Sequence, residues 1–427
     1  MARKTQNKDY MMKRILLSAL LCVAAAFLSS AQQSDYLARL QAHPEFLDGT
    51  DYVCPTGPVA LTKAPKGYKA FYISHYSRHG ARYASQSDLY GRLHEVLSRA
   101  ADDDNLTSFG QDYKRRFDSL YPEVKYRTGD LSKVGWDQQQ ALAARMYANF
   151  PTAFTDESEV QAWTSTSTRC VMTMSSFCLG LKASNPKMTL VENFGKVYLP
   201  AILPLDGGNP FREKDYPRTP LSFDESLEHY ISRTLDYRPI LERLFKDPDK
   251  AVKPKKQWDF VSYLWFFGAG MNSLETELDF NDLFTPEERV ALWKIDDFQF
   301  YSDAWPTHMG YRPILDDIIS KADARIAEGR SGADLRFGHD YTLLPLMMIL
   351  NIDGIGTDVK DPDEIPVWFQ TYRVPMGANI QLVFYRNRKN PKTLFKILLN
   401  GEEASLPLET DSWPYYDWDV FKEHFAR

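Results

Sequence analysis

Residues 71–83 read Phe71-Tyr-Ile-Ser-His-Tyr-Ser-Arg-His-Gly-Ala-Arg-Tyr83, an apolar, β-prone run that ends in a polar loop. In this loop Arg78 and Arg82 flank His79 and Gly80. A helix is expected next, because the apolar residues that follow recur at helical spacing, at Leu89, Leu93, Val96, Leu97 and Ala100. The order of strand, loop and helix is typical of an α/β fold, in which ligands bind at the carboxyl ends of strands. We therefore expect chemistry at this loop.

Two further strand-to-helix junctions carry polar side chains. Residues 160–163 favour a strand, a polar loop follows, and a helical pattern runs from Arg169 to Leu181. Arg169 therefore lies at a helix start, where free amides and the helix dipole favour anions. Residues 333–338 favour another strand, and His339-Asp340 come directly before a helical run over 341–350.

The three junctions together supply three guanidiniums, two imidazoles and one carboxylate. Guanidiniums pair with phosphate oxygens, a neutral imidazole can attack phosphorus, and a carboxylic acid can protonate a departing alcohol. This set fits phosphoryl transfer without a metal. Each group alone has a simpler interpretation, as a surface turn, a solvated helix start or a helix cap. The repeated strand-to-helix context favours one shared pocket instead.

The composition narrows the class of protein. The chain has 427 residues with 44% hydrophobic content, enough for one large domain or two smaller ones with a core. Its formal net charge is −6, and removal of residues 1–31, with five basic residues and one acidic residue, would leave about −10. This acidity argues against nucleic acid as a partner. An anionic ligand must be held by a local basic pocket.

The first 31 residues are interpreted as a secretory signal peptide. Lys13-Arg14 precede an apolar run of about 14 residues, and Ser29-Ser30-Ala31 offers small residues for cleavage. An uncleaved anchor is the weaker interpretation, because roughly 20 apolar residues are needed to span a bilayer. A lipoprotein site at Cys22 is weaker still, since Leu21 precedes it. We expect a periplasmic or secreted protein with no membrane association after cleavage.

Three cysteines remain in the mature chain, at positions 54, 170 and 178. This odd number permits at most one intramolecular disulfide. Cys170 and Cys178 lie about 12 Å apart along a predicted helix, too far to bridge. If a bond forms, Cys54 takes part in it.

Residues 196–330 have a different character from the rest, with few β-prone runs. Helices are predicted over 223–237, 258–274, 286–304 and 312–328. The third begins with a capping pattern at Thr285-Pro286-Glu-Glu288, and Gly329 suits the end of the fourth. Trp265-Phe-Phe267 are interpreted as core. Basic residues of this region that could face a cleft, although each is more simply interpreted as solvated, are Arg212, Lys214 and Arg218.

The expected domains are a signal peptide at 1–31, an α/β core formed by 45–195 plus 331–427, and a helical cap at 196–330. In the core, residues 379–385 and 393–399 should pair as a hairpin.

The motifs resemble those of the histidine acid phosphatases (histidine phosphatase superfamily, clade 2), which include phytases and multiple inositol polyphosphate phosphatases. The family pattern Arg-His-Gly-x-Arg-x-Pro matches residues 78–84, with Ala84 in place of Pro. The other matching stretches, in order, are Leu131-Ser-Lys-Val-Gly-Trp-Asp-Gln138, Ser165-Thr-Ser-Thr-Arg169-Cys170, Gly338-His339-Asp340 and the hairpin strand Asn379-Ile-Gln-Leu-Val-Phe-Tyr-Arg386.

The resemblance implies a phosphoglycerate mutase-like three-layer α/β core with an inserted helical cap, and a reaction that needs no cofactor and no metal. It implies that His79 is the nucleophile, forming a phosphohistidine, and that Asp340 protonates the leaving alkoxide and then activates water. The residues that would hold the phosphoryl oxygens are Arg78, Arg82, Arg169 and His339.

The expected function is hydrolysis of phosphomonoesters, with phytate and related inositol phosphates as substrates. Inositol polyphosphate phosphatases commonly carry His-Ala-Glu where this chain has His339-Asp340. A broad acid phosphatase acting on sugar phosphates or other small monoesters is therefore the enzymatic alternative. An alternative from another class is a phosphate-binding surface protein without turnover. The partner is a small phosphorylated molecule, and the oligomeric state is open.

Overall fold

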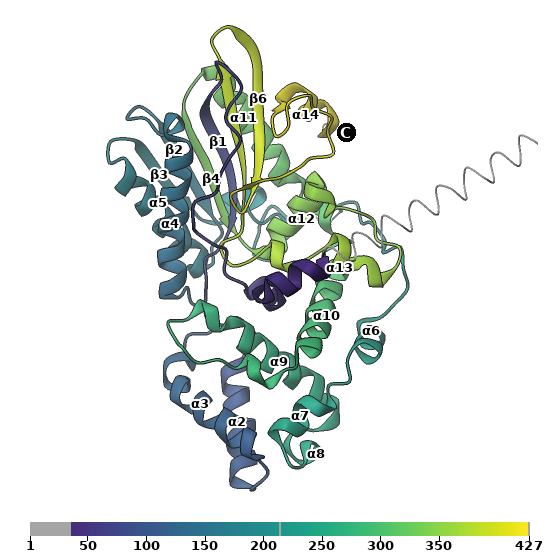
Figure 1. Ribbon diagram of the computed structural model, residues 1–427. Coiled ribbons are helices and arrows are strands. Elements are labelled where there is room, and N and C mark those ends of the chain that lie inside the picture. The colour runs from purple at the N-terminus through teal and green to yellow at the C-terminus, as the bar shows by residue number, and fades with distance from the viewer. Residues whose placement is uncertain (1–35, 213–214, 426–427) are drawn as a thin grey trace, which may run out of the picture.

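The computed structural model describes residues 36–212 and 215–425. The expected signal peptide and Lys214 lie outside the described residues. Figure 1 shows a large sheet with helices beside it, and a group of helices at the opposite end of the molecule. Among the helices of the described ranges, none combines the length and the apolar character needed to cross a membrane.

The central sheet follows the order β3-β2-β4-β1-β5-β6-β7, and β8 pairs with β6. The first four strands in this order are parallel, whereas β5 runs antiparallel to β1 and forms the predicted hairpin with β6. The strands are β1 (Lys69–Arg78), β2 (Glu159–Thr164), β3 (Thr189–Phe194), β4 (Gly332–Gly338), β5 (Asn379–Asn387), β6 (Asn390–Leu399), β7 (Glu402–Glu403) and β8 (Tyr416–Asp417).

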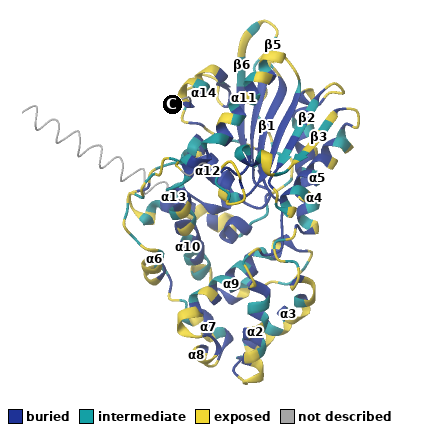
Figure 2. Cartoon of the chain, turned by 180° about the vertical axis from the view of Figure 1, so that it is seen from behind, coloured by how far each residue is buried: buried dark blue, intermediate teal, exposed yellow. Residues whose placement is uncertain are grey.

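Helices cover both faces of this sheet. On one face α4 and α5 pack together, and α5 packs on β2, β3 and β4; on the other face α11 and α12 pack against β1. Successive side chains of β1 point to opposite faces of the sheet, since Ile73 lies in one apolar cluster and its neighbour Tyr72 lies in the other. Figure 2 shows the central strands as buried. The expected three-layer α/β class is therefore confirmed.

The longer helices are α2 (Leu89–Asp102), α3 (Ser108–Val124), α4 (Lys133–Asn149), α5 (Thr168–Ser184), α9 (Gln257–Ala269), α10 (Pro286–Ala304), α11 (Arg312–Glu328) and α12 (Asp340–Leu350). The shorter ones are α6 (Leu227–Thr234), α7 (Arg238–Leu244), α8 (Pro248–Ala251), α13 (Ile365–Trp368) and α14 (Trp418–Phe425). A 3-10 helix, η1 (Pro44–Asp51), precedes β1.

The ends of α10 and α11 agree with the ranges predicted from the sequence. Thr285 and Glu288 form the reciprocal capping box that the pattern indicates. Gly329 ends α11 with a φ of 64°, a left-handed conformation that glycine adopts readily. Trp265 and Phe267 are buried in the core, as predicted.

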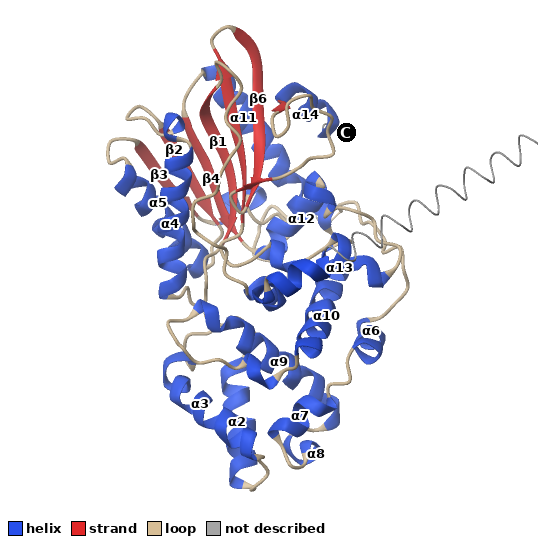
Figure 3. Cartoon of the chain, viewed as in Figure 1, coloured by secondary structure: helices blue, strands red, loops and turns tan. Residues whose placement is uncertain are grey.

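The helical part of the molecule is formed by two separate stretches of chain, one before residue 130 and one after residue 195. Helices α2 and α3, from before residue 130, pack with α7, α8 and α9. Figure 3 shows these helices together at the end opposite the sheet. Conversely, α11 packs on the sheet although it lies before residue 330 in the chain. The expected division at residues 195 and 330 stays a prediction.

The three cysteines of the described chain are free thiols, and all are buried. His75, in the middle of β1, is also buried and stacks on Phe177 with ring centroids 5.3 Å apart. It is a packed core histidine.

Candidate active site

The sheet brings the three polar junctions together at one edge. Arg78 at the end of β1 pairs with Gly338 at the end of β4, so the residues that follow these strands leave the sheet side by side. The rings of His79 and His339 lie edge to face with centroids 5.6 Å apart. Arg169, from the start of α5, reaches the same place, where its Nη2 is 3.3 Å from His339 Nδ1. The predicted site residues therefore converge.

His79 presents one ring nitrogen to the site. Its Nδ1 lies 3.0 Å from the Gly80 carbonyl oxygen, which can only accept a hydrogen bond. The proton is therefore on Nδ1, and Nε2 keeps its lone pair. Burial, reinforced by Arg78 and Arg82, lowers the pKa of His79 well below its usual value. A neutral imidazole with a free lone pair has the state that a nucleophile requires.

Three guanidiniums near this site have N–H donors that make no hydrogen bond within the described residues. Within the part of the chain that the structure describes, the buried Nε atoms of Arg78, Arg82 and Arg169 have no hydrogen-bond partner. Buried donors without a partner are unfavourable. Their convergence indicates a site for an anion with several oxygens, because guanidiniums match phosphate geometry.

Arg78 is fixed by groups from distant parts of the chain. Its Nη1 donates to the carbonyl oxygens of Thr50 and Val374, at 2.5 and 2.7 Å. Its Nη2 lies 2.7 Å from Asp340 Oδ2. The guanidinium is fully buried, so its orientation is set by these three contacts.

Asp340 is the first residue of α12, and the backbone N–H of Tyr341 donates to its Oδ1 at 2.7 Å. Burial alone would raise the pKa of this carboxyl, but Arg78 and Arg82 outweigh burial and hold the pKa below its usual value. Without a bound anion, Asp340 is therefore a carboxylate.

His339 is neutral as well. Burial, followed by the charge of Arg169, lowers the pKa of His339 to about 3. Its Nε2 is 3.3 Å from Ser165 Oγ, and its ring stacks on Tyr341 with centroids 4.8 Å apart. The neighbouring Cys170 donates to the Gly338 carbonyl oxygen, and burial raises the pKa of its thiol to about 11, so it stays protonated.

The stretch from Leu131 to Gln138 holds the loop that carries His79. Gln138 Oε1 accepts from the Ala81 backbone N–H at 3.1 Å, while its Nε2 donates to the carbonyls of Cys54 and Met376. Gly135 lies so close that an added Cβ would be 2.0 Å from the Ala81 oxygen. This motif therefore positions the loop.

The sequence interpretation missed Asp51, at the end of η1. Its Oδ1 lies 3.8 Å from Arg82 Nη2, and the side chain is buried. Asp51 lies in a turn-rich part of the sequence, with Pro44, Gly49 and Pro55 nearby. No local pattern distinguishes this aspartate from other turn residues, since its contact depends on tertiary structure.

Three further points of the sequence interpretation concern Ala84, the basic residues of the region 196–330 and metal binding. Ala84, where the family pattern has Pro, donates its backbone N–H to the Tyr90 hydroxyl at 2.8 Å, a bond that Pro cannot make. Arg212 and Arg218 are exposed. Within residues 36–212 and 215–425, no three His, Cys, Asp or Glu side chains are grouped as metal ligands.

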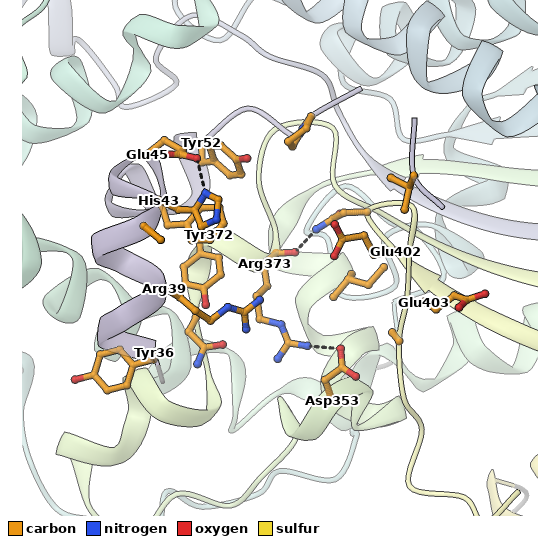
Figure 4. A pocket seen from close by; sticks show the side chains of 18 of the residues that line it. Tyr36, Arg39, His43, Glu45, Tyr52, Asp353, Tyr372, Arg373, Glu402 and Glu403 are labelled. Atoms are coloured by element: carbon orange, nitrogen blue, oxygen red, sulfur yellow. Dashed lines mark hydrogen bonds and ion pairs between the residues drawn. The ribbon is translucent and has the colours of Figure 1, made fainter. Parts of the chain in front are cut away.

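A cavity of about 920 Å³ lies elsewhere, between the first described residues and the C-terminal part of the chain. Figure 4 shows Arg373 in it beside Asp353, with which it forms an ion pair at 3.0 Å, and His43 beside Glu45. The predicted nucleophile and proton donor do not line this cavity.

The chain is similar to a known protein family and to several solved structures. The model of the histidine phosphatase superfamily (branch 2) matches residues 76–400. The multiple inositol polyphosphate phosphatase of Bifidobacterium longum, solved in complex with inositol hexasulfate, is similar over 88% of this chain and 98% of its own, with a TM-score of 0.68 and 17% identity. The phytase of D. castellii is similar over 90% and 84%, with a TM-score of 0.60 and 17% identity.

The phytase of Citrobacter braakii is similar over 84% of this chain and 97% of its own, with a TM-score of 0.56 and 13% identity. At these identities the likeness establishes the fold. No curated protein sequence matches the chain.

Proposed function

Because the chain belongs to branch 2 of the histidine phosphatase superfamily, we propose that it hydrolyses inositol polyphosphates such as phytate through a phosphohistidine on His79. The observation that carries the proposal is the grouping of three arginines around a neutral histidine and a carboxyl group, each arginine with a buried Nε that has no partner among the described residues. Such a site combines an anion receptor, a nucleophile and an acid.

In the first half-reaction, the phosphate dianion of the substrate binds to Arg78, Arg82 and Arg169. It competes with Asp340 for the charge of Arg78, which raises the pKa of that carboxyl and favours its protonated form. His79 Nε2 attacks phosphorus, the P–N bond forms, and the P–O bond to the alcohol breaks. Asp340 gives its proton to the leaving alkoxide.

In the second half-reaction, Asp340 is a carboxylate again and takes a proton from water. The water oxygen attacks phosphorus, the P–N bond breaks, and its electron pair returns to His79 Nε2. Inorganic phosphate leaves, and Asp340 is protonated as at the start of the first half-reaction. The arginines stabilise the charge on the equatorial oxygens in both transition states.

The substrate class is supported by the fold shared with an inositol polyphosphate phosphatase and a phytase. His339-Asp340, in place of the His-Ala-Glu common in inositol polyphosphate phosphatases, favours a second candidate substrate class, small monoesters such as sugar phosphates. We also propose that the protein acts outside the cytoplasm, on the basis of the apolar run and small residues near its N-terminus.

The test is phosphate release from phytate and from an aryl phosphate, with a chelator present. Wild type should release phosphate from both, and His79→Ala should release none. His94→Ala is the matched control, because His94 lies on α2 and stacks on Tyr121. Equal activity of wild type and His79→Ala would refute the mechanism. Activity on the aryl ester alone would replace inositol phosphates by small monoesters.

A further inference from the structure

The end of η1 contacts both arginines of the loop that carries His79. Thr50 accepts from Arg78 Nη1 through its carbonyl oxygen, and the next residue, Asp51, lies 3.8 Å from Arg82 Nη2. Both side chains of the ion pair between Asp51 and Arg82 are 6–7% exposed. A buried carboxylate at this distance acts on the guanidinium mainly through its charge.

We infer that Asp51 is a positioning residue for phosphoryl transfer. It holds the Arg82 guanidinium toward the phosphate, and its charge weakens the electrostatic stabilisation of the Asp340 carboxylate by Arg78 and Arg82. This inference rests on the proposed function of the site. It assigns a role to a segment that contributes neither a nucleophile nor a proton donor.

The contacts of Arg82 show how the orientation is set. Its Nη1 donates to the Tyr83 carbonyl oxygen at 3.0 Å, and its Nη2 faces Asp51. Its Nε has no partner among the described residues. Both terminal nitrogens are therefore occupied, and the Nε edge remains for a phosphate oxygen. Among the described residues, removing the Asp51 charge would leave the Tyr83 carbonyl as the one hydrogen-bonding or ionic partner of this guanidinium.

The charges around Asp51 show why it affects Asp340. Arg78 and Arg82 lower the pKa of both carboxyls, and the charge of Asp340 raises the pKa of Asp51. Because charge repulsion is reciprocal, a charge on Asp51 also disfavours ionisation of Asp340. The titratable or charged groups that face Asp51 from the elements packed around it are Arg78, Arg82, Asp340 of α12, Asp296 of α10, Asp48 of η1 and Tyr90 of α2.

Asp296 does not act as a competing anion near neutral pH. Burial, followed by the nearby Asp51, raises the pKa of Asp296 to about 8. Gly49 lets this uncharged carboxyl lie close to η1, because a Cβ at position 49 would be 2.9 Å from Asp296 Oδ2. Its φ of 56° is also a conformation that glycine adopts most readily. Burial raises the pKa of Asp51 above its ordinary value, whereas Arg82 and Arg78 oppose this rise and favour the carboxylate form that faces them.

The test compares Asp51→Asn with Asp48→Asn. Asp48 is the matched control, because it is buried in the same 3-10 helix but pairs with Arg289 at 2.8 Å. The readouts are kcat and KM for an alkyl phosphate and an aryl phosphate, the pH profile of kcat, and the thermal unfolding midpoint.

Asp51→Asn should lower kcat for the alkyl phosphate about tenfold or more, change KM less, and move the basic limb of the pH profile down by about one pH unit. The direction follows because loss of a neighbouring negative charge favours the ionised form of Asp340, which must be protonated to act as the acid. Asp48→Asn should change neither kcat nor the pH profile.

Three outcomes would overturn the inference. Wild-type kcat and a wild-type pH profile in Asp51→Asn would refute the role of Asp51 while the proposed function stands. Equal losses in Asp51→Asn and Asp48→Asn, with lower unfolding midpoints, would show that the segment has only a structural role. Absence of turnover by the wild type on these two esters and on phytate would refute the proposed function and this inference together.

Discussion

Substitution of Gly135 by alanine should damage the active site without adding any new chemical group to it. Gly135 lies in the first turn of α4, where the helix backbone touches the loop that carries His79. An added Cβ would lie 2.0 Å from the Ala81 carbonyl oxygen and 2.7 Å from its backbone nitrogen. Ordinary contacts of a Cβ begin at 3.4 Å, so the two backbones would have to separate by more than 1 Å.

The size of the effect follows from this displacement. A misplacement of about 1 Å in a catalytic group reduces the rate about 100-fold, because the geometry of attack is lost. Overpacking destabilises a protein by about 1–3 kcal/mol, and the better helix propensity of alanine offsets up to about 1 kcal/mol of that. We therefore expect kcat to fall about 100-fold while the protein loses at most about 3 kcal/mol of stability.

The assay is steady-state hydrolysis of an aryl phosphate, with thermal unfolding of the same samples. Gly270→Ala is the control, because no heavy atom beyond its immediate chain neighbours lies within 4 Å of a Cβ added there and its φ is −78°. This control should keep wild-type kcat. Wild-type kcat in Gly135→Ala, or an equal loss in Gly270→Ala, would refute the reasoning.

Three further predictions concern Asp340, Asp296 and Ala84. Asp340→Asn should slow formation of the phosphohistidine from an alkyl phosphate by about 10²–10⁴-fold, and much less from an aryl phosphate whose leaving group needs no proton; equal losses in this first step, measured in a single turnover, would contradict its role as the acid. Asp296 should make the protein less stable at higher pH, because its folded pKa of about 8 exceeds the ordinary 3.8, so its contribution is complete below pH 3.8 and is lost as the pH rises through about 8. Between pH 5 and pH 8 the free energy of unfolding in urea should fall by up to about 4 kcal/mol from this group, and an unchanged slope in Asp296→Asn would argue against it. Ala84→Pro should destabilise the protein by about 1 kcal/mol, since the Tyr90 hydroxyl loses its donor, with kcat within a few-fold of wild type; an unchanged unfolding midpoint would show that this bond contributes nothing.

The parts of the site that the sequence predicts are those with a local pattern. Arg169 and His339-Asp340 each follow a strand and begin a helix, so their neighbours along the chain indicate where they lie. The parallel pairing of β1 with β4 then brings His79 and His339 to the same edge. Likewise α10 was predicted with its observed ends, because the capping residues at its start are a local signal.

The parts that were not predicted depend on contacts between distant segments, or on weak patterns. Asp51 meets Arg82 only because η1 lies against the loop after β1. Strand β3 has no buried residue, so it lacks the apolar signal of a core strand. Helix α3 is different: Tyr113, Phe117, Leu120 and Val124 recur at helical spacing and are buried, so this helix could have been predicted.

The anchoring of Arg78 has a consequence for protein synthesis. The two carbonyl oxygens that hold its guanidinium belong to residues 28 positions before it and 296 positions after it. A ribosome-bound chain that ends before Val374 therefore has the histidine but cannot yet fix the arginine beside it. Because contacts so far apart in sequence form late, the contacts of Arg78 are completed only after Val374 has been synthesised. A polypeptide truncated before Val374 should consequently be inert, and phosphatase activity should appear only in chains that include this residue.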